Sequence, residues 1–346
     1  MSIHMRPLSR RDVLTMLGAA PTAAAVAAVS PAQSGPSIAT PPPVSGKTHL
    51  CLVSRHLQWA DVQEGAAAAA EGGCQAVAWT IRGGAHILPP NVERDLPRAV
   101  EAARRAGLET PMVITAIVDA RSERVEAILD TMRGLGIRHY RAAPFRYDYN
   151  ANLAAQIEAL KPRIAGLATL NQKYGTTAMY HTHSGAGNVG GGVWDLWLAM
   201  KDLDPEFVGI NYDLGHATIR GGTGWVETSR IAHRHVRGLS VKDFRWVKGV
   251  PGRRGSGPWS AEMVPGGEGM VDFKGMLGYF KSVGFAGPVE LYQEYSVTVP
   301  GRAEPVNMLG TDYGNWKLEM PRTEWISLLK RDVAFYSAAL RDAGLM

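Results

Sequence analysis

One apolar segment of the sequence ends in two side chains that could carry out chemistry. Residues 208–213 read VGINYD, and their apolar positions alternate as in a buried β-strand. Asp213 ends this segment, and His216 follows three residues later. Parallel α/β proteins place catalytic groups at such strand ends and in the loops after them. The alternative is structural: Asp213 would cap the next helix, and His216 would be an ordinary loop histidine.

Polar side chains also end most of the other predicted strands. The ends of five further apolar segments carry Arg82, Arg141, His181 with His183, Lys242, and Glu294. Imidazole, carboxylate and ammonium groups transfer protons in active sites, and the first two also bind divalent metals. We therefore expect these side chains and Asp213 to line one pocket at one end of the barrel. The alternatives are structural ion pairs, for Lys242 with Asp213 or Asp243, and for Arg82 and Arg141 with other acids.

The elements that must position these side chains alternate along the chain. Strands are expected at 50–53, 76–81, 111–118, 137–142, 177–183, 208–213, 237–243 and 288–292, with helical patterns between them. The helix at 151–174 is expected to break or kink near Pro162, and residues 245–269 to form a long loop. This alternation predicts a single-domain α/β protein, a (β/α)8 TIM barrel over residues 48–346. A doubly wound open sheet is the alternative, but it would not bring so many strand ends to one site.

The N-terminal residues predict export rather than a folded element. The residues SRRDVL at 9–14 precede a short apolar, Ala-rich run. This arrangement resembles a twin-arginine signal peptide over residues 1–32, which would carry the protein to the periplasm or otherwise out of the cytoplasm. An ordinary secretory signal or a membrane anchor is the alternative, but the run is short for a membrane span. The Pro-rich residues 33–47 are expected to be a disordered linker.

Composition limits the class of protein further. The 346 residues are 45% hydrophobic, which is enough for a sizeable core. The net charge is +5, but charges of both signs are interspersed, so no nucleic-acid partner is expected. The sequence contains no Gly-rich dinucleotide or P-loop motif. Cys51 and Cys74 both lie in apolar segments, which favours two buried thiols over a disulfide.

Four segments together resemble the xylose-isomerase-like TIM barrels of the sugar phosphate isomerase/epimerase superfamily. They read YHTH at 180–183, DLGH at 213–216, VKD at 241–243, and PGGEGMVDF at 265–273 leading into 287–294. The resemblance extends over most of the chain. The residues RGGAH at 82–86 resemble those of an exported branch of this family. The resemblance implies the same barrel that the alternation of elements predicts.

The resemblance also implies a divalent metal, such as manganese or zinc, held by a Glu, an Asp, a His and a Glu from strands five to eight. At the matching positions this chain has His181, Asp213, Ser240 and Glu294. Imidazole still suits a metal, whereas the hydroxyl of Ser240 is a poor ligand. The expected metal ligands are therefore His181, Asp213 and Glu294. Either His183 or His216 completes the site, or the protein works without a metal.

The family's usual reaction moves a proton next to a carbonyl group. The resemblance thus implies a sugar isomerase or epimerase that acts on an unphosphorylated sugar or keto-sugar. The candidate catalytic residues are Glu294, His183, His216 and Lys242, and the candidate substrate-binding residues are Arg82, His86, Arg141, Tyr147 and Trp246. The alternatives are a lyase or hydrolase of keto-glycosides or cyclitols on the same barrel, or a non-catalytic exported sugar-binding protein. Besides the small sugar, the expected partners include neither nucleic acid nor membrane, and a homo-oligomer is compatible with the sequence.

Overall fold

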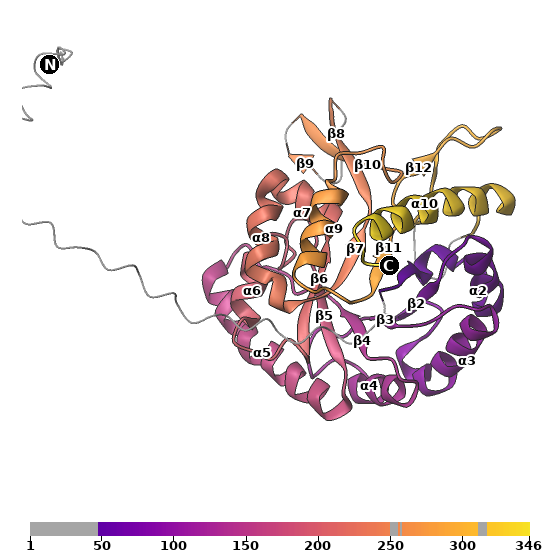
Figure 1. Cartoon of the computed structure of the whole chain (residues 1–346). Helices are drawn as coiled ribbons and strands as arrows, with labels where there is room; N and C mark the ends of the chain where they lie inside the picture. Colours follow the sequence, from indigo (N-terminus) through magenta and orange to yellow (C-terminus); the bar gives the residue numbers. More distant parts are fainter. Residues whose placement is uncertain (1–47, 250–254, 257, 311–316) are drawn as a thin grey trace, which may run out of the picture. The chain divides into compact units, whose positions relative to one another are not determined.

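The computed structural model describes residues 48–249, 255–256, 258–310 and 317–346. The predicted signal peptide at 1–32 and the predicted linker at 33–47 lie outside the described residues. The described chain forms a closed barrel of parallel strands with helices around it (Figure 1). The prediction of a (β/α)8 TIM barrel is confirmed, and the alternative of an open sheet is wrong.

The barrel strands follow the expected order along the chain. They are β1 (Leu50–Val53), β2 (Ala76–Ile81), β3 (Met112–Thr115), β4 (His139–Ala142), β5 (Thr177–His181), β6 (Val208–Asp213), β7 (Val236–Val241) and β11 (Val289–Leu291). The first strand pairs with both β2 and β11, which closes the barrel. Strand β5 ends at His181, two residues earlier than predicted from the segment 177–183. His183 therefore lies in the loop above the barrel.

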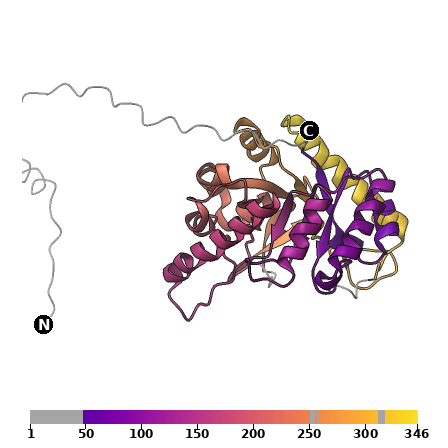
Figure 2. The ribbon, with the colours of Figure 1, turned by 90° about the horizontal axis from the view of Figure 1, so that it is seen from below.

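Nine α-helices are found in the described part of the chain. They are α2 (Val62–Glu71), α3 (Val92–Arg105), α4 (Val125–Gly134), α5 (Leu153–Tyr174), α6 (Trp194–Met200), α7 (Leu214–Gly221), α8 (Trp225–Ala232), α9 (Phe273–Ser282) and α10 (Arg322–Asp342). The last helix packs beside the first strand, and Figure 2 shows this yellow helix next to the indigo part of the barrel. No helix among the described residues is long and apolar enough to cross a membrane.

Helix α5 continues through Pro162, so of the expected break or kink the break is wrong. A proline removes one backbone hydrogen bond from a helix interior. The buried side chains Leu160, Ile164 and Leu167 lie on either side of it along α5 and pack in the core. Their burial offsets the missing bond.

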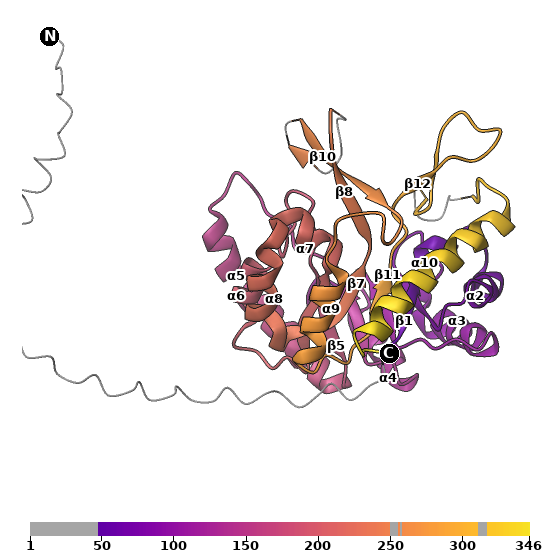
Figure 3. The same ribbon diagram turned by 45° about the horizontal axis from the view of Figure 1, so that its top comes forward.

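The segment expected as a long loop at 245–269 contains an antiparallel sheet instead. Its strands are β8 (Asp243–Lys248), β9 (Gly255–Ser256) and β10 (Trp259–Val264), and Asp243 pairs with Val264 at its base. Only Lys242 separates the end of β7 from the start of β8, so the sheet extends from the carboxyl ends of the barrel strands (Figure 3). A second, two-stranded sheet of β12 (Ser296–Val297) and β13 (Val306–Asn307) follows β11.

Alternate strand residues divide the core into two clusters. Leu50 and Leu52 belong to the large cluster, whereas Cys51 and Val53 belong to a small cluster that includes Met179. Because successive strand residues face opposite sides of the sheet, the small cluster fills the barrel interior below the site. Cys51 and Cys74 are both buried free thiols, as predicted.

Candidate active site

A cavity of about 190 Å³ is lined by residues from the carboxyl ends of the barrel strands. The residues singled out in the sequence that line it are Arg82, Arg141, His181, His183, Lys242 and Glu294. Arg55 also lines it; it lies in the short 3-10 helix η1 (Ser54–Leu57) after β1, and the sequence analysis did not identify it. Strand ends distant in the sequence therefore meet here, because parallel strands share one direction.

Lys242, directly after β7, makes three polar contacts among the site residues. Its Nζ lies 2.8 Å from Oε1 of Glu294, 2.9 Å from Nε2 of His216 and 3.0 Å from Oδ2 of Asp213. The side chain is only 2% exposed. Of the alternative ion pairs considered for Lys242, the pair with Asp213 is present, and Asp243 instead binds backbone amides.

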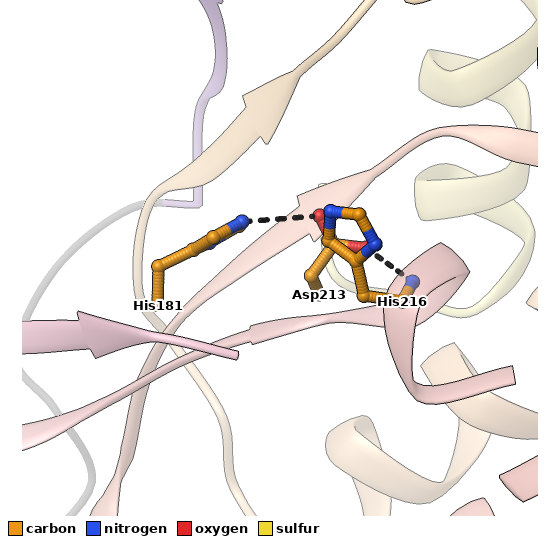
Figure 4. Close-up of side chains that lie close together, drawn as sticks. All are labelled: His181, Asp213 and His216. Atoms are coloured by element: carbon orange, nitrogen blue, oxygen red, sulfur yellow. Dashed lines mark hydrogen bonds and ion pairs between the residues drawn. The ribbon is translucent and has the colours of Figure 1, made fainter. Parts of the chain in front are cut away.

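Asp213 uses its two carboxylate oxygens for different purposes. Oδ1 accepts a hydrogen bond of 2.7 Å from the backbone N–H of His216 and so caps α7. Oδ2 faces Lys242 and lies 3.6 Å from Nε2 of His181 (Figure 4). Burial raises the pKa of Asp213 to about 6, so the carboxylate remains an anion at neutral pH. Asp213 therefore caps α7, as the structural alternative expected, and its second oxygen is still directed at the site.

The histidines of the site have assignable hydrogen-bonding roles. Burial lowers the pKa of His181 well below its usual value, so this ring is neutral. Its Nδ1 lies 3.1 Å from Oδ1 of Asn211, which places the proton there and leaves the lone pair of Nε2 facing Asp213. Nε2 of His216 accepts a hydrogen bond from Nζ of Lys242, and its Nδ1 lies 2.8 Å from the hydroxyl of Ser184. Nδ1 of His183 accepts the backbone N–H of residue 185, so its proton is on Nε2.

A buried carboxylate that the sequence analysis missed lies deeper in the barrel. Oε2 of Glu290 in β11 lies 2.7 Å from the hydroxyl of Ser240, 3.2 Å from Nδ2 of Asn211 and 3.4 Å from Nη1 of Arg141. Arg141 also donates to the hydroxyl of Tyr292. Ser240 therefore supports Glu290 rather than binding a metal. A charged residue inside the short apolar strand 289–291 was the signal that could have identified Glu290.

Three predicted substrate-binding residues do not line this cavity, although the structure describes all of them. The ring of His86 lies 3.1–3.2 Å from two backbone carbonyls before α2, and its burial lowers its pKa. The hydroxyl of Tyr147 donates to Asp195, and Trp246 lies in β8 on the projecting sheet. Each follows a strand end in the sequence, but the path of the following loop carries it away from the cavity.

Among the described residues, three could hold a metal ion by the type and spacing of their ligand atoms. Atoms of His181, Asp213 and His216 all lie within 4.8 Å of one another, and zinc or manganese accepts two imidazoles and a carboxylate. Glu294, predicted as a ligand, is not in this group and accepts from Lys242. The donor types fit a metal.

The surroundings of this group do not fit a metal as they stand. The ammonium of Lys242 already contacts Asp213 and His216. A divalent ion about 2.1 Å from the same ligand atoms would lie within about 5 Å of this ammonium. At an effective dielectric constant of about 20, the repulsion would be about 7 kcal/mol or more. A metal could enter only after Lys242 had moved away.

Comparisons with known proteins agree with this architecture. No curated protein sequence matches the chain significantly. Among solved structures, the chain is similar to the IolI protein with a binding zinc atom, with a TM-score of 0.61, 14% identity, and coverage of 84% of this chain and 99% of that one. It is also similar to an L-ribulose 3-epimerase, with a TM-score of 0.59, 15% identity, and coverage of 86% and 96%.

A third similar structure belongs to the probable 3-DHS dehydratase AsbF of Bacillus anthracis. The TM-score is 0.55 and the identity 13%, with coverage of 71% of this chain and 92% of that one. Identities this low show a shared fold alone. The family model described as xylose isomerase-like TIM barrel matches residues 66–306, which is more than half of the chain. The protein therefore belongs to the xylose isomerase-like TIM barrel family.

Proposed function

We propose that this protein is a carbohydrate epimerase or isomerase that moves a proton next to the carbonyl group of an unphosphorylated sugar or keto-sugar. The observation that carries the proposal is that a carboxylate, an imidazole and an ammonium group share one small cavity: Glu294, His183 and Lys242 all line it. Membership of the family and similarity to an L-ribulose 3-epimerase support it.

The proposed proton transfer assigns separate roles to two of these groups. The carboxylate of Glu294 accepts the proton from the carbon beside the carbonyl, and the C–H electrons form an enediolate whose oxygen becomes negative. The cationic side chains of the cavity stabilise this oxygen. His183 gives the proton on its Nε2 to the opposite face of the carbon, which inverts its configuration. The ring then recovers a proton from water, and Glu294 releases its proton to water, so no net proton is consumed.

The cavity also limits the substrate. Its volume of about 190 Å³ is below the roughly 300–1,000 Å³ of drug-sized ligand pockets, so we propose a small sugar rather than a polymer. Arg55, Arg82 and Arg141 contribute guanidinium groups to its wall. Such groups bind hydroxyls or a carboxylate in pairs of hydrogen bonds. An oxidised sugar or sugar acid is therefore the favoured substrate class.

Deuterium from D₂O is expected to enter the substrate at the carbon beside its carbonyl group. The measurement is NMR and mass analysis of keto-pentoses, keto-hexoses and their acids incubated with the protein in D₂O. A deuterated epimer or isomer supports the proposal. A lyase or hydrolase remains the second candidate, because the same proton abstraction begins an elimination and a similar structure is a probable dehydratase. Loss of water or of an aglycone would favour it, and binding without any exchange would favour a sugar-binding protein.

We also propose that residues 1–32 direct export by the twin-arginine route. Replacing both Arg10 and Arg11 by lysine is expected to leave the precursor in the cytoplasm, because this route depends on the arginine pair. The measurement is cell fractionation with an antibody against the mature protein. Arg6→Lys is the matched control and should not change export. Continued export of the double variant would contradict the proposal.

A further inference from the structure

We infer that the ammonium group of Lys242 is the built-in cation of this site and occupies the place that a divalent metal would need. That Lys242 occupies this place follows from contacts within the protein. The role of Lys242 in catalysis rests on the proposed function, because it concerns the enediolate formed in the cavity.

The ammonium is enclosed by acceptors from three separate elements. Asp213 comes from the end of β6, His216 from the first turn of α7, and Glu294 from the segment after β11; all three lie within 3.0 Å of Nζ. An ammonium group has three N–H donors. It is hydrogen-bonded to His216 and Glu294, and its contact with Asp213 is an ion pair. The ring centroid of Tyr292 lies 4.6 Å from Nζ and adds a cation–π contact.

The chain makes room for this lysine at Gly215. A Cβ atom at Gly215 would lie 2.7 Å from Cγ of Lys242 and 2.9 Å from its carbonyl oxygen. Gly215 does not have a positive φ, so its backbone conformation does not require glycine. The glycine between Asp213 and His216 is therefore needed for space, and that space is filled by the stem of Lys242.

The lysine and a metal would compete for the same atoms. Of the three residues that could hold a metal, Lys242 contacts Asp213 and His216, and only His181 is outside these contacts. The hydroxyl of Ser240, on the neighbouring strand β7, contacts Glu290 and is not among these three residues. A metal would thus have to displace an ammonium that already contacts Asp213, His216 and Glu294.

The fixed ammonium supplies what the proposed reaction needs from a cation. When Glu294 removes the proton, the C–H electrons form a C=C bond and the carbonyl π electrons move to oxygen. Lys242 keeps its own proton and donates a hydrogen bond to this oxygen, at the cost of one of its present contacts. The reaction then requires no divalent ion.

Zinc binding tests the occupancy without any substrate. The full protein is stripped with EDTA and titrated with zinc by calorimetry. Lys242→Ala is expected to bind zinc about 100-fold more tightly than the wild type, because its loss exposes the ligand atoms of Asp213 and His216. Adding Asp213→Ala to this variant should remove the gain. Arg82→Ala, which removes a positive charge from the same cavity wall, should bind zinc as weakly as the wild type.

The wild type alone gives a second test that does not depend on the folding of Lys242→Ala. Its deuterium exchange is expected to be unchanged by EDTA and by added zinc. Stoichiometric zinc or manganese in the purified wild type, or zinc binding as tight as in Lys242→Ala, would overturn the inference. A protein that exchanges no sugar would instead contradict the proposed function, and the zinc result would still stand.

Discussion

Glu294→Gln is expected to lower solvent-deuterium exchange by about 10²-fold or more. A carboxamide nearly preserves the shape of the side chain, but it cannot accept the proton from carbon. Its oxygen can still accept the hydrogen bond that Lys242 makes at 2.8 Å, so the fold around the site should be retained. The measurement compares exchange rates and melting temperatures of the variant and the wild type.

Glu262→Gln provides the control for this change. Glu262 lies in β10 on the projecting sheet and pairs with Arg245, and both side chains are about half exposed. The same loss of a carboxylate there should leave exchange unchanged. Exchange at the wild-type rate in Glu294→Gln would exclude Glu294 as the base and transfer this role to His183 or His181, the imidazoles that line the cavity.

Asp243→Asn is expected to reduce the free energy of unfolding by about 3 kcal/mol or more. The carboxylate of Asp243 is buried and accepts four backbone N–H groups. Oδ1 accepts from Phe244 at 2.9 Å and Val271 at 3.2 Å, and Oδ2 accepts from Gly267 and Gly269 at 3.0 Å each. An asparagine would place an NH₂ group against two of these donors and leave them unsatisfied. Urea unfolding at neutral pH measures the difference.

Asp272→Asn makes the same chemical change at an exposed position. Asp272 caps α9 by accepting the N–H of Gly275, and asparagine is an equally good N-cap residue. Its stability should therefore stay close to that of the wild type. Equal stability of Asp243→Asn and Asp272→Asn would contradict the structural role assigned to Asp243.

Asp243 also explains two of the segments on which the family resemblance rests. The glycine-rich residues 265–269 wrap around its carboxylate, and a Cβ atom at Gly269 would lie 2.1 Å from Oδ1 of Asp243. Gly267 has a φ of +88°, a conformation that favours glycine. The segments VKD and PGGEG thus interact directly with each other, and the acid of the first anchors the loop of the second.

Local patterns in the sequence were enough to predict the barrel. The strands β1, β2 and β6 begin and end at the predicted residues, because runs of apolar residues with clear ends mark buried strands. Parallel strands in a barrel all end at the same rim, so the polar strand ends were also correctly expected to meet. Arg82, Arg141, His181, Lys242 and Glu294 do line one cavity, whereas Asp213, which was expected with them, is fully buried and does not line it.

Only the tertiary structure decided which of these groups touch. Register pairs Asp213 with Ser240, and Ser240 with Glu290, and this alignment depends on closure of the barrel rather than on neighbours in sequence. It also decided the directions of loops, which separate His86 and Trp246 from the cavity. Closure of the barrel likewise brings Lys242 into contact with acceptors from other elements. Distances between side chains on different strands are set by packing of the whole barrel, so a lysine that looked like one of several candidate acid–base groups turned out to occupy the cation position.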